Sequence, residues 1–82
     1  MLEKQVFTDA LEAAITRVFP KRPGRPIGDD EPFATFGIDS LAQMNMLLEL
    51  ENALNLPTED VELLEQNTPA TLFRYLADLD AS

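Results

Sequence analysis

The segment Gly37–Leu41 reads Gly-Ile-Asp-Ser-Leu and leads directly into a leucine-rich helical pattern. A serine in the first turn of a helix projects from a rigid point, and the positive end of the helix dipole favours a phosphate group attached there. Gly37 lets the backbone turn tightly before it. A purely structural role is also open, because Asp39 can cap the helix and Ser40 with Gln43 offers an alternative capping box.

The composition restricts the other chemistry that the chain could perform. It has no cysteine and no histidine, which excludes thiolate nucleophiles, disulfides, zinc-thiolate sites and Ser-His pairs. With few options for a nucleophile and its base, we expect the chain not to be an enzyme and to hold no metal.

The first segment has the apolar periodicity of an amphipathic helix, and the pattern predicts a helix from about Glu3 to Phe19. Pro20 and Pro23 with Gly24 end it. The apolar stripe of this helix consists of Val6, Phe7, Ala10, Leu11, Ala14, Ile15 and Val18.

Residues 20–38 contain four prolines and three glycines and show neither helical nor strand periodicity. This predicts a long loop, which in a small domain is either attached to the core or a flexible linker. The aromatic content favours attachment through Phe33, Phe36 and Ile38.

The next helix is predicted from about Ser40 to Leu54, where Pro57 follows. Its apolar residues form two stripes that cannot both face one neighbouring helix. One stripe comprises Met46, Leu47, Leu50 and Leu54. The other, here called the apolar strip, comprises Leu41, Met44 and Leu48. The strip is either buried against a second neighbour or exposed as an interface.

Two further helices follow. Thr58–Glu65 reads as a short helix with Val61 and Leu64 facing inward. Thr68 followed by Pro69 then marks a helix start. These elements predict an all-α four-helix bundle formed by a single domain, residues 1–82, and its last helix carries the stripe Leu72, Phe73, Leu76 and Leu79.

The charge is strongly acidic, with fifteen acids against six bases and a net charge of −9. This argues against nucleic acid and anionic membranes as partners. No stretch is long enough to span a membrane, so we expect a cytoplasmic protein. Between Pro26 and Phe73 there are ten acids and no base. They form either a solvated surface that aids solubility or a docking surface for enzymes with basic patches.

Taken together, several features resemble the acyl and peptidyl carrier protein family over roughly Val6–Leu79. They are the Gly-Ile-Asp-Ser-Leu string near mid-chain, the long loop before it, the helix containing Glu49 and Glu51, and Thr68-Pro69 at the last helix.

The resemblance implies that Ser40 receives a covalent 4′-phosphopantetheine arm, whose thiol carries cargo as a thioester. Gly37 and Leu41 belong to the attachment motif, and Asp39 is read by the modifying enzyme or helps to hold its metal ion. The implied partners are a phosphopantetheinyl transferase, an enzyme that loads an acyl or aminoacyl group, and downstream synthases or transferases.

The surface expected to meet these enzymes combines part of the apolar strip with nearby acids. Its residues are Met44, Leu48, Glu49, Glu51, Asp60 and Glu62. We expect the chain to act as a monomer.

Within the family, Asp before the serine is similar to acyl carriers of fatty-acid and polyketide systems, and Phe36-Gly37-Ile38 departs from the usual peptidyl carrier pattern. We therefore favour a discrete acyl carrier of specialised metabolism. An aminoacyl, peptidyl or aryl carrier of a nonribosomal peptide-type pathway is the alternative. In a different class, the chain is a small acidic adaptor that is never modified.

Overall fold

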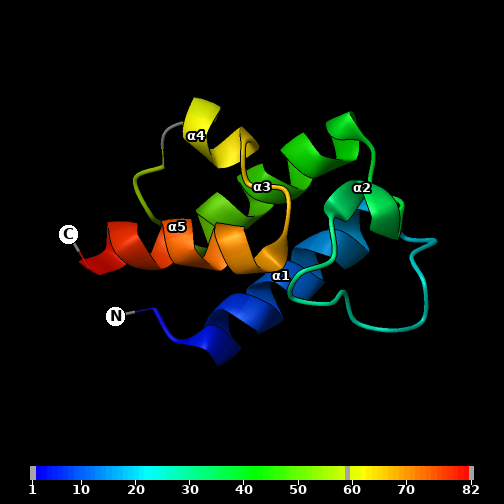
Figure 1. Ribbon diagram of the computed structural model, residues 1–82, viewed down its shortest axis with the longest axis horizontal. Helices are drawn as coiled ribbons and strands as arrows, with labels where there is room; N and C mark the ends of the chain where they lie inside the picture. The colour runs from blue at the N-terminus through cyan, green and yellow to red at the C-terminus, as the bar shows by residue number, and fades with distance from the viewer. Residues whose placement is uncertain (1, 59, 82) are drawn as a thin grey trace.

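The computed structural model describes residues 2–58 and 60–81. These residues contain no strand, and none of their helices is both long and apolar enough to cross a bilayer. The helices are α1 (Lys4–Val18), α2 (Phe33–Phe36), α3 (Ser40–Leu54), α4 (Asp60–Leu64) and α5 (Pro69–Ala81) (Figure 1). The all-helical fold expected from the sequence is confirmed, with α2 added inside the long loop.

Helix α1 packs against α3, and α5 joins them through an aromatic contact in which the rings of Phe7 and Phe73 lie 5.2 Å apart. The start of α1 and the end of α5 lie at one end of the molecule, and the loop between α1 and α2 lies at the other (Figure 1). The core lies between these three helices, and each large side chain fully buried there stabilises the fold by roughly 1.5–3 kcal/mol. Its buried side chains include Phe7, Leu11, Ile15, Met46, Leu47, Leu50, Leu72 and Leu76.

The long loop is attached to the core, as expected. Phe33, Phe36 and Ile38 are all buried. Two backbone hydrogen bonds also join the loop to the start of α5, one from Phe33 N to Asn67 O (2.9 Å) and one from Ala70 N to Asp29 O (2.8 Å). The segment before α3 is therefore held from several sides.

The expectation that Val61 and Leu64 of α4 face inward is wrong. Val61 is 72% exposed and Leu64 43% exposed, whereas Leu63 is 3% exposed and packs in the core. Because α4 has only five residues, only about one turn of it contacts the core. In such a short helix Leu63 can be the buried residue in place of Val61 and Leu64. Val61 and Leu64, three residues apart, share the outward face instead.

Candidate functional site

Ser40 is the first residue of α3 and is exposed. The cap of this helix is Asp39, whose Oδ1 accepts a hydrogen bond from Ala42 N at 2.8 Å. The alternative capping box does not form: the Gln43 N–H donates to Asp39 O at 2.8 Å, and the Gln43 side chain donates to Gln66 O at 3.3 Å. Within the described part of the chain, no hydrogen bond involves the Ser40 hydroxyl. This hydroxyl therefore lies exposed at a helix N-terminus and is not used to stabilise the fold.

The backbone reaches Ser40 through a tight and well-supported turn. Gly37 ends α2 with φ of 109°, and its N–H donates to Ala34 O at 3.1 Å. A Cβ at Gly37 would lie 3.1 Å from Cζ of Phe19, so the position needs glycine for both its dihedral angle and its space. Ile38 is buried and donates its N–H to Phe33 O at 3.0 Å.

A surface hollow of about 430 Å³ lies beside the serine, lined by Ser40, Leu41, Gln43, Met44, Leu64 and Asn67. A second hollow of about 160 Å³ lies between α3 and α4 and is lined by Met44, Leu47, Leu48, Leu63 and Leu64. The two share Met44 and Leu64, so an apolar path runs from the serine along α3 toward α4. Gln43 and Asn67 add polar groups close to Ser40.

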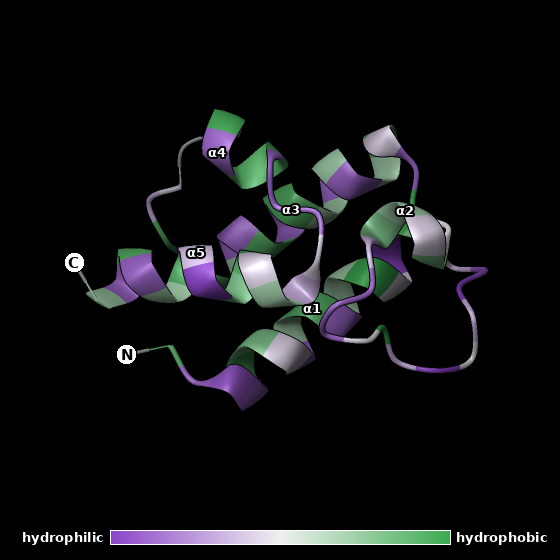
Figure 2. Cartoon of the chain, in the orientation of Figure 1, coloured by the Kyte–Doolittle hydropathy of each residue, from purple (hydrophilic) through white to green (hydrophobic). Residues whose placement is uncertain are grey.

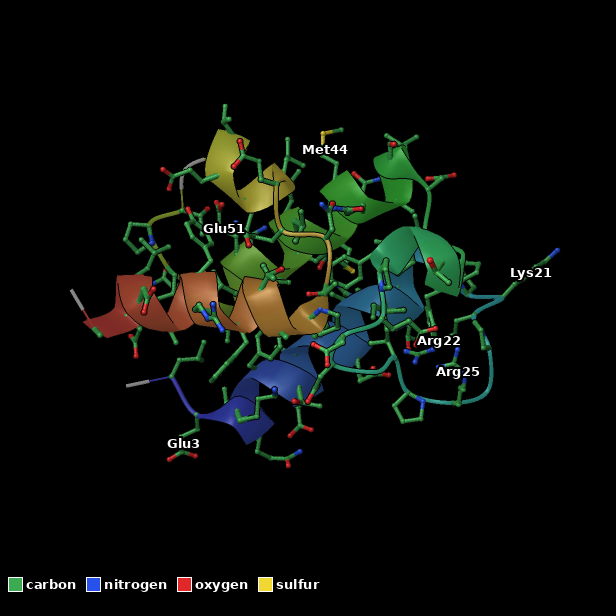
Figure 3. All side chains as sticks on the ribbon, viewed as in Figure 1. Glu3, Lys21, Arg22, Arg25, Met44 and Glu51 are labelled. Carbon is green, nitrogen blue, oxygen red and sulfur yellow. The ribbon has the colours of Figure 1, made fainter. Side chains whose placement is uncertain are left out.

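The apolar strip is on the surface. Leu41, Met44 and Leu48 are 64%, 39% and 44% exposed, and the exposed Val61 and Leu64 of α4 extend the same kind of surface. Figure 2 shows hydrophobic residues at the outer tip of α4, and in Figure 3 Met44 projects away from the body of the molecule. We call these five residues the apolar face.

The acids expected beside this face have different surroundings. Glu49 forms an ion pair with Arg17 of α1 at 2.9 Å, and Glu51 accepts a hydrogen bond from the Thr58 hydroxyl. Glu62 is exposed on α4. The side chain of Asp60 lies outside the described part of the structure. Glu62 thus has an exposed carboxylate on α4, whereas Glu49 and Glu51 already have polar partners.

Sequence reasoning missed part of the lining of the first hollow. Gln43 follows Ser40 at helical spacing and could have been found from that spacing. Leu64 and Asn67 belong to α4 and the segment after it, and only the packing of α4 against α3 brings them beside the serine.

The all-helical bundle, with its long attached loop and short α4, is of the acyl carrier protein type. The family model described as a phosphopantetheine attachment site matches residues 9–76, and the chain belongs to this family. A domain of this family is a site of covalent 4′-phosphopantetheine attachment, and it works with phosphopantetheinyl transferases and synthase enzymes. Carrier domains are generally not catalytic themselves. Neither the curated proteins nor the solved structures gave a match.

Proposed function

We propose that Ser40 carries the phosphopantetheine arm and that the chain, as a single carrier domain, is a discrete acyl carrier of polyketide-type or other specialised metabolism. The observation that carries this proposal is the exposed Ser40 hydroxyl, which is free of the cap at the start of α3 and lies beside the hollow of about 430 Å³. The surroundings of Ser40 fit a phosphopantetheine group. The phosphate ester would lie at a helix N-terminus, and the flexible arm would lie along an open, largely apolar surface.

The protein's part in attachment is to present one oxygen. Ser40 Oγ would attack a phosphorus atom of the diphosphate of coenzyme A and form the new P–O bond. The phosphoanhydride bond breaks, the adenosine bisphosphate leaves, and the hydroxyl proton passes to a base of the transferase. Once attached, the arm supplies the thiol that carries cargo as a thioester. The first-turn N–H groups of α3 stabilise the phosphodiester charge.

The acyl assignment is supported by the sequence around the serine. Asp39 before Ser40 fits acyl carriers, and Phe36-Gly37-Ile38 departs from the usual peptidyl pattern. The aminoacyl, peptidyl or aryl alternative is supported by the same Asp-Ser-Leu string, which stand-alone aminoacyl carriers also contain. Incubating the modified protein with acyl-transferring and with adenylate-forming loading enzymes separates the two cargo classes.

Mass spectrometry tests the attachment itself. The unmodified protein is incubated with coenzyme A, magnesium and a broad-specificity phosphopantetheinyl transferase, and we expect it to gain the mass of one arm. Ser40→Ala should gain none yet stay folded, because the Asp39 cap does not use the serine hydroxyl. A wild-type chain that is never modified would indicate the adaptor, and an alanine variant that is modified elsewhere would exclude Ser40.

A further inference from the structure

The loop between α1 and α2 contains an arginine that is held almost like a core residue. The Arg22 side chain is only 14% exposed and forms an ion pair with Glu12 of α1, from Nη2 to Oε1, at 2.6 Å. Its Nη2 also donates to Arg25 O at 3.0 Å, and its Nη1 donates to Thr16 Oγ1 at 3.4 Å. One planar guanidinium therefore joins the second half of α1 to the loop.

Arg22 and Arg25 both also lie against the ring of Phe36. Their Cζ atoms are 5.4 Å and 5.1 Å from its centroid, within the range of cation–π attraction. Phe36 is buried and is the last residue of α2. Figure 3 shows Arg22 and Arg25 together under α2, whereas Lys21 points away from the molecule.

Arg25 forms a bidentate ion pair with Glu31, with distances of 2.8 Å and 2.7 Å between the guanidinium nitrogens and the carboxylate oxygens. The Gly28 N–H donates to the same carboxylate at 3.0 Å. The Phe36 ring is thus covered by two cations that are themselves fixed by carboxylates.

Phe36 stands directly before the segment that leads to the serine. Gly37 follows it with a fixed positive φ against Phe19, and the buried Ile38 leads to the cap of α3. We infer that Arg22 is a positioning residue for Ser40, acting through Phe36 to hold the serine hydroxyl where a transferase can use it. This inference rests on Ser40 being the attachment site.

Steady-state kinetics of arm attachment test the inference with a matched control. Arg22→Gln and Lys21→Gln remove the same charge from adjacent residues, but Lys21 is exposed and makes no ion pair within the described residues. We expect Arg22→Gln to lower kcat about tenfold, because small displacements of a nucleophile are costly. Its KM should stay within about twofold, since the apolar face is unchanged. Lys21→Gln should change neither, and Arg22→Lys should recover part of kcat because it keeps the charge beside Glu12.

The split between kcat and KM separates positioning from loss of folded protein. If Arg22→Gln merely unfolds a fraction of the molecules, the effective substrate concentration falls, so that KM rises while kcat is retained. That result, or kinetics equal to those of Lys21→Gln, would overturn the inference.

Hydrogen exchange on the unmodified protein gives a second readout. Arg22→Gln should speed exchange of the Gly37 and Ile38 amides while leaving that of Leu76 in α5 unchanged. If Arg22→Gln changed the exchange rate of all three amides by the same factor, or changed none of them, that result would also contradict the inference. Different results contradict the two proposals. If the wild-type protein accepts no arm, both the attachment site at Ser40 and the positioning role of Arg22 are wrong. A wild type that is modified normally, with an equally active Arg22→Gln, removes only the positioning role.

Discussion

At the scale of single residues, Gly37 is a backbone position that tolerates little change. Its φ of 109° opposes a side chain, and so does the Phe19 ring, which would lie 3.1 Å from a Cβ at this position. We expect Gly37→Ala to lower the free energy of unfolding by about 1–3 kcal/mol in denaturant melts. Gly24→Ala is the control, because nothing lies within 4 Å of its Cβ position. Equal melts for the two variants would contradict this prediction.

Glu31 gives a prediction about pH. The side-chain hydrogen bond from Arg25 and the backbone hydrogen bond from Gly28 lower the pKa of Glu31 from 4.5 to about 2. A lowered pKa in the folded state means that the carboxylate stabilises the fold above pH 4.5, and that this contribution is lost as the pH falls toward 2.

The measurement is the free energy of unfolding of wild type and Glu31→Gln across that range. The difference between them should be largest near neutral pH and should shrink as Glu31 becomes protonated. Asp30→Asn, at the neighbouring exposed carboxylate, serves as the control. A difference that stays constant down to the acid limit would show that the pair with Arg25 does not stabilise the fold.

The residue scale also shows what sequence reasoning can reach. The sequence predicts the start of α3 correctly, because Asp39, Ser40 and the leucine pattern are adjacent in the chain and capping is a local interaction. The contact of Arg22 with Phe36 joins residues far apart in an irregular loop. No periodicity connects such residues, so only the folded chain reveals their contact.

At the scale of elements, α3 has one buried and one exposed apolar stripe, and this allows a direct comparison. Met44 is 39% exposed and Leu47 is 1% exposed, on the same helix. We expect Leu47→Ala to cost roughly 2–5 kcal/mol of stability and Met44→Ala less than about 1.5 kcal/mol. Met44→Ala should nevertheless slow modification or loading several-fold, because methionine suits a surface that meets several partners.

Denaturant melts and attachment kinetics on both variants check this prediction. Equal destabilisation would make Met44 part of the core, and unchanged kinetics would remove it from the partner surface.

The short helices mark the limit of pattern reasoning at this scale. The four residues of α2 cannot show a helical period, so the sequence predicts only a loop there. In α4, the choice between Leu63 and its neighbours depends on the angle at which one turn meets α3. Long helices average over many contacts, and for that reason the sequence predicts the bounds of α3 correctly and those of α1 to within a residue.

At the scale of the whole molecule, charge is unevenly distributed. The surroundings of each acidic residue indicate how strongly it should speed association with basic enzymes. Glu62 is exposed on α4, whereas Glu49 is paired with Arg17. We expect Glu62→Lys to slow association more than Glu49→Lys at low salt, and the gap should narrow as salt screens the charges. Both variants should keep their stability within about 1 kcal/mol. Association rates of wild type and both variants across a salt series measure this. Rates for both variants that equal the wild-type rate at low salt would reduce the acids to an aid to solubility.

We expect the backbone hydrogen bonds from Phe33 to Asn67 and from Ala70 to Asp29 to affect the order of events during synthesis as well. A ribosome delivers the chain from its N-terminus, so Ser40 emerges before the residues that complete these bonds. Until α5 is available, the loop ahead of the serine lacks these two hydrogen bonds. Arm attachment should therefore wait for α5, so that a chain truncated before α5 is a poor substrate for the transferase.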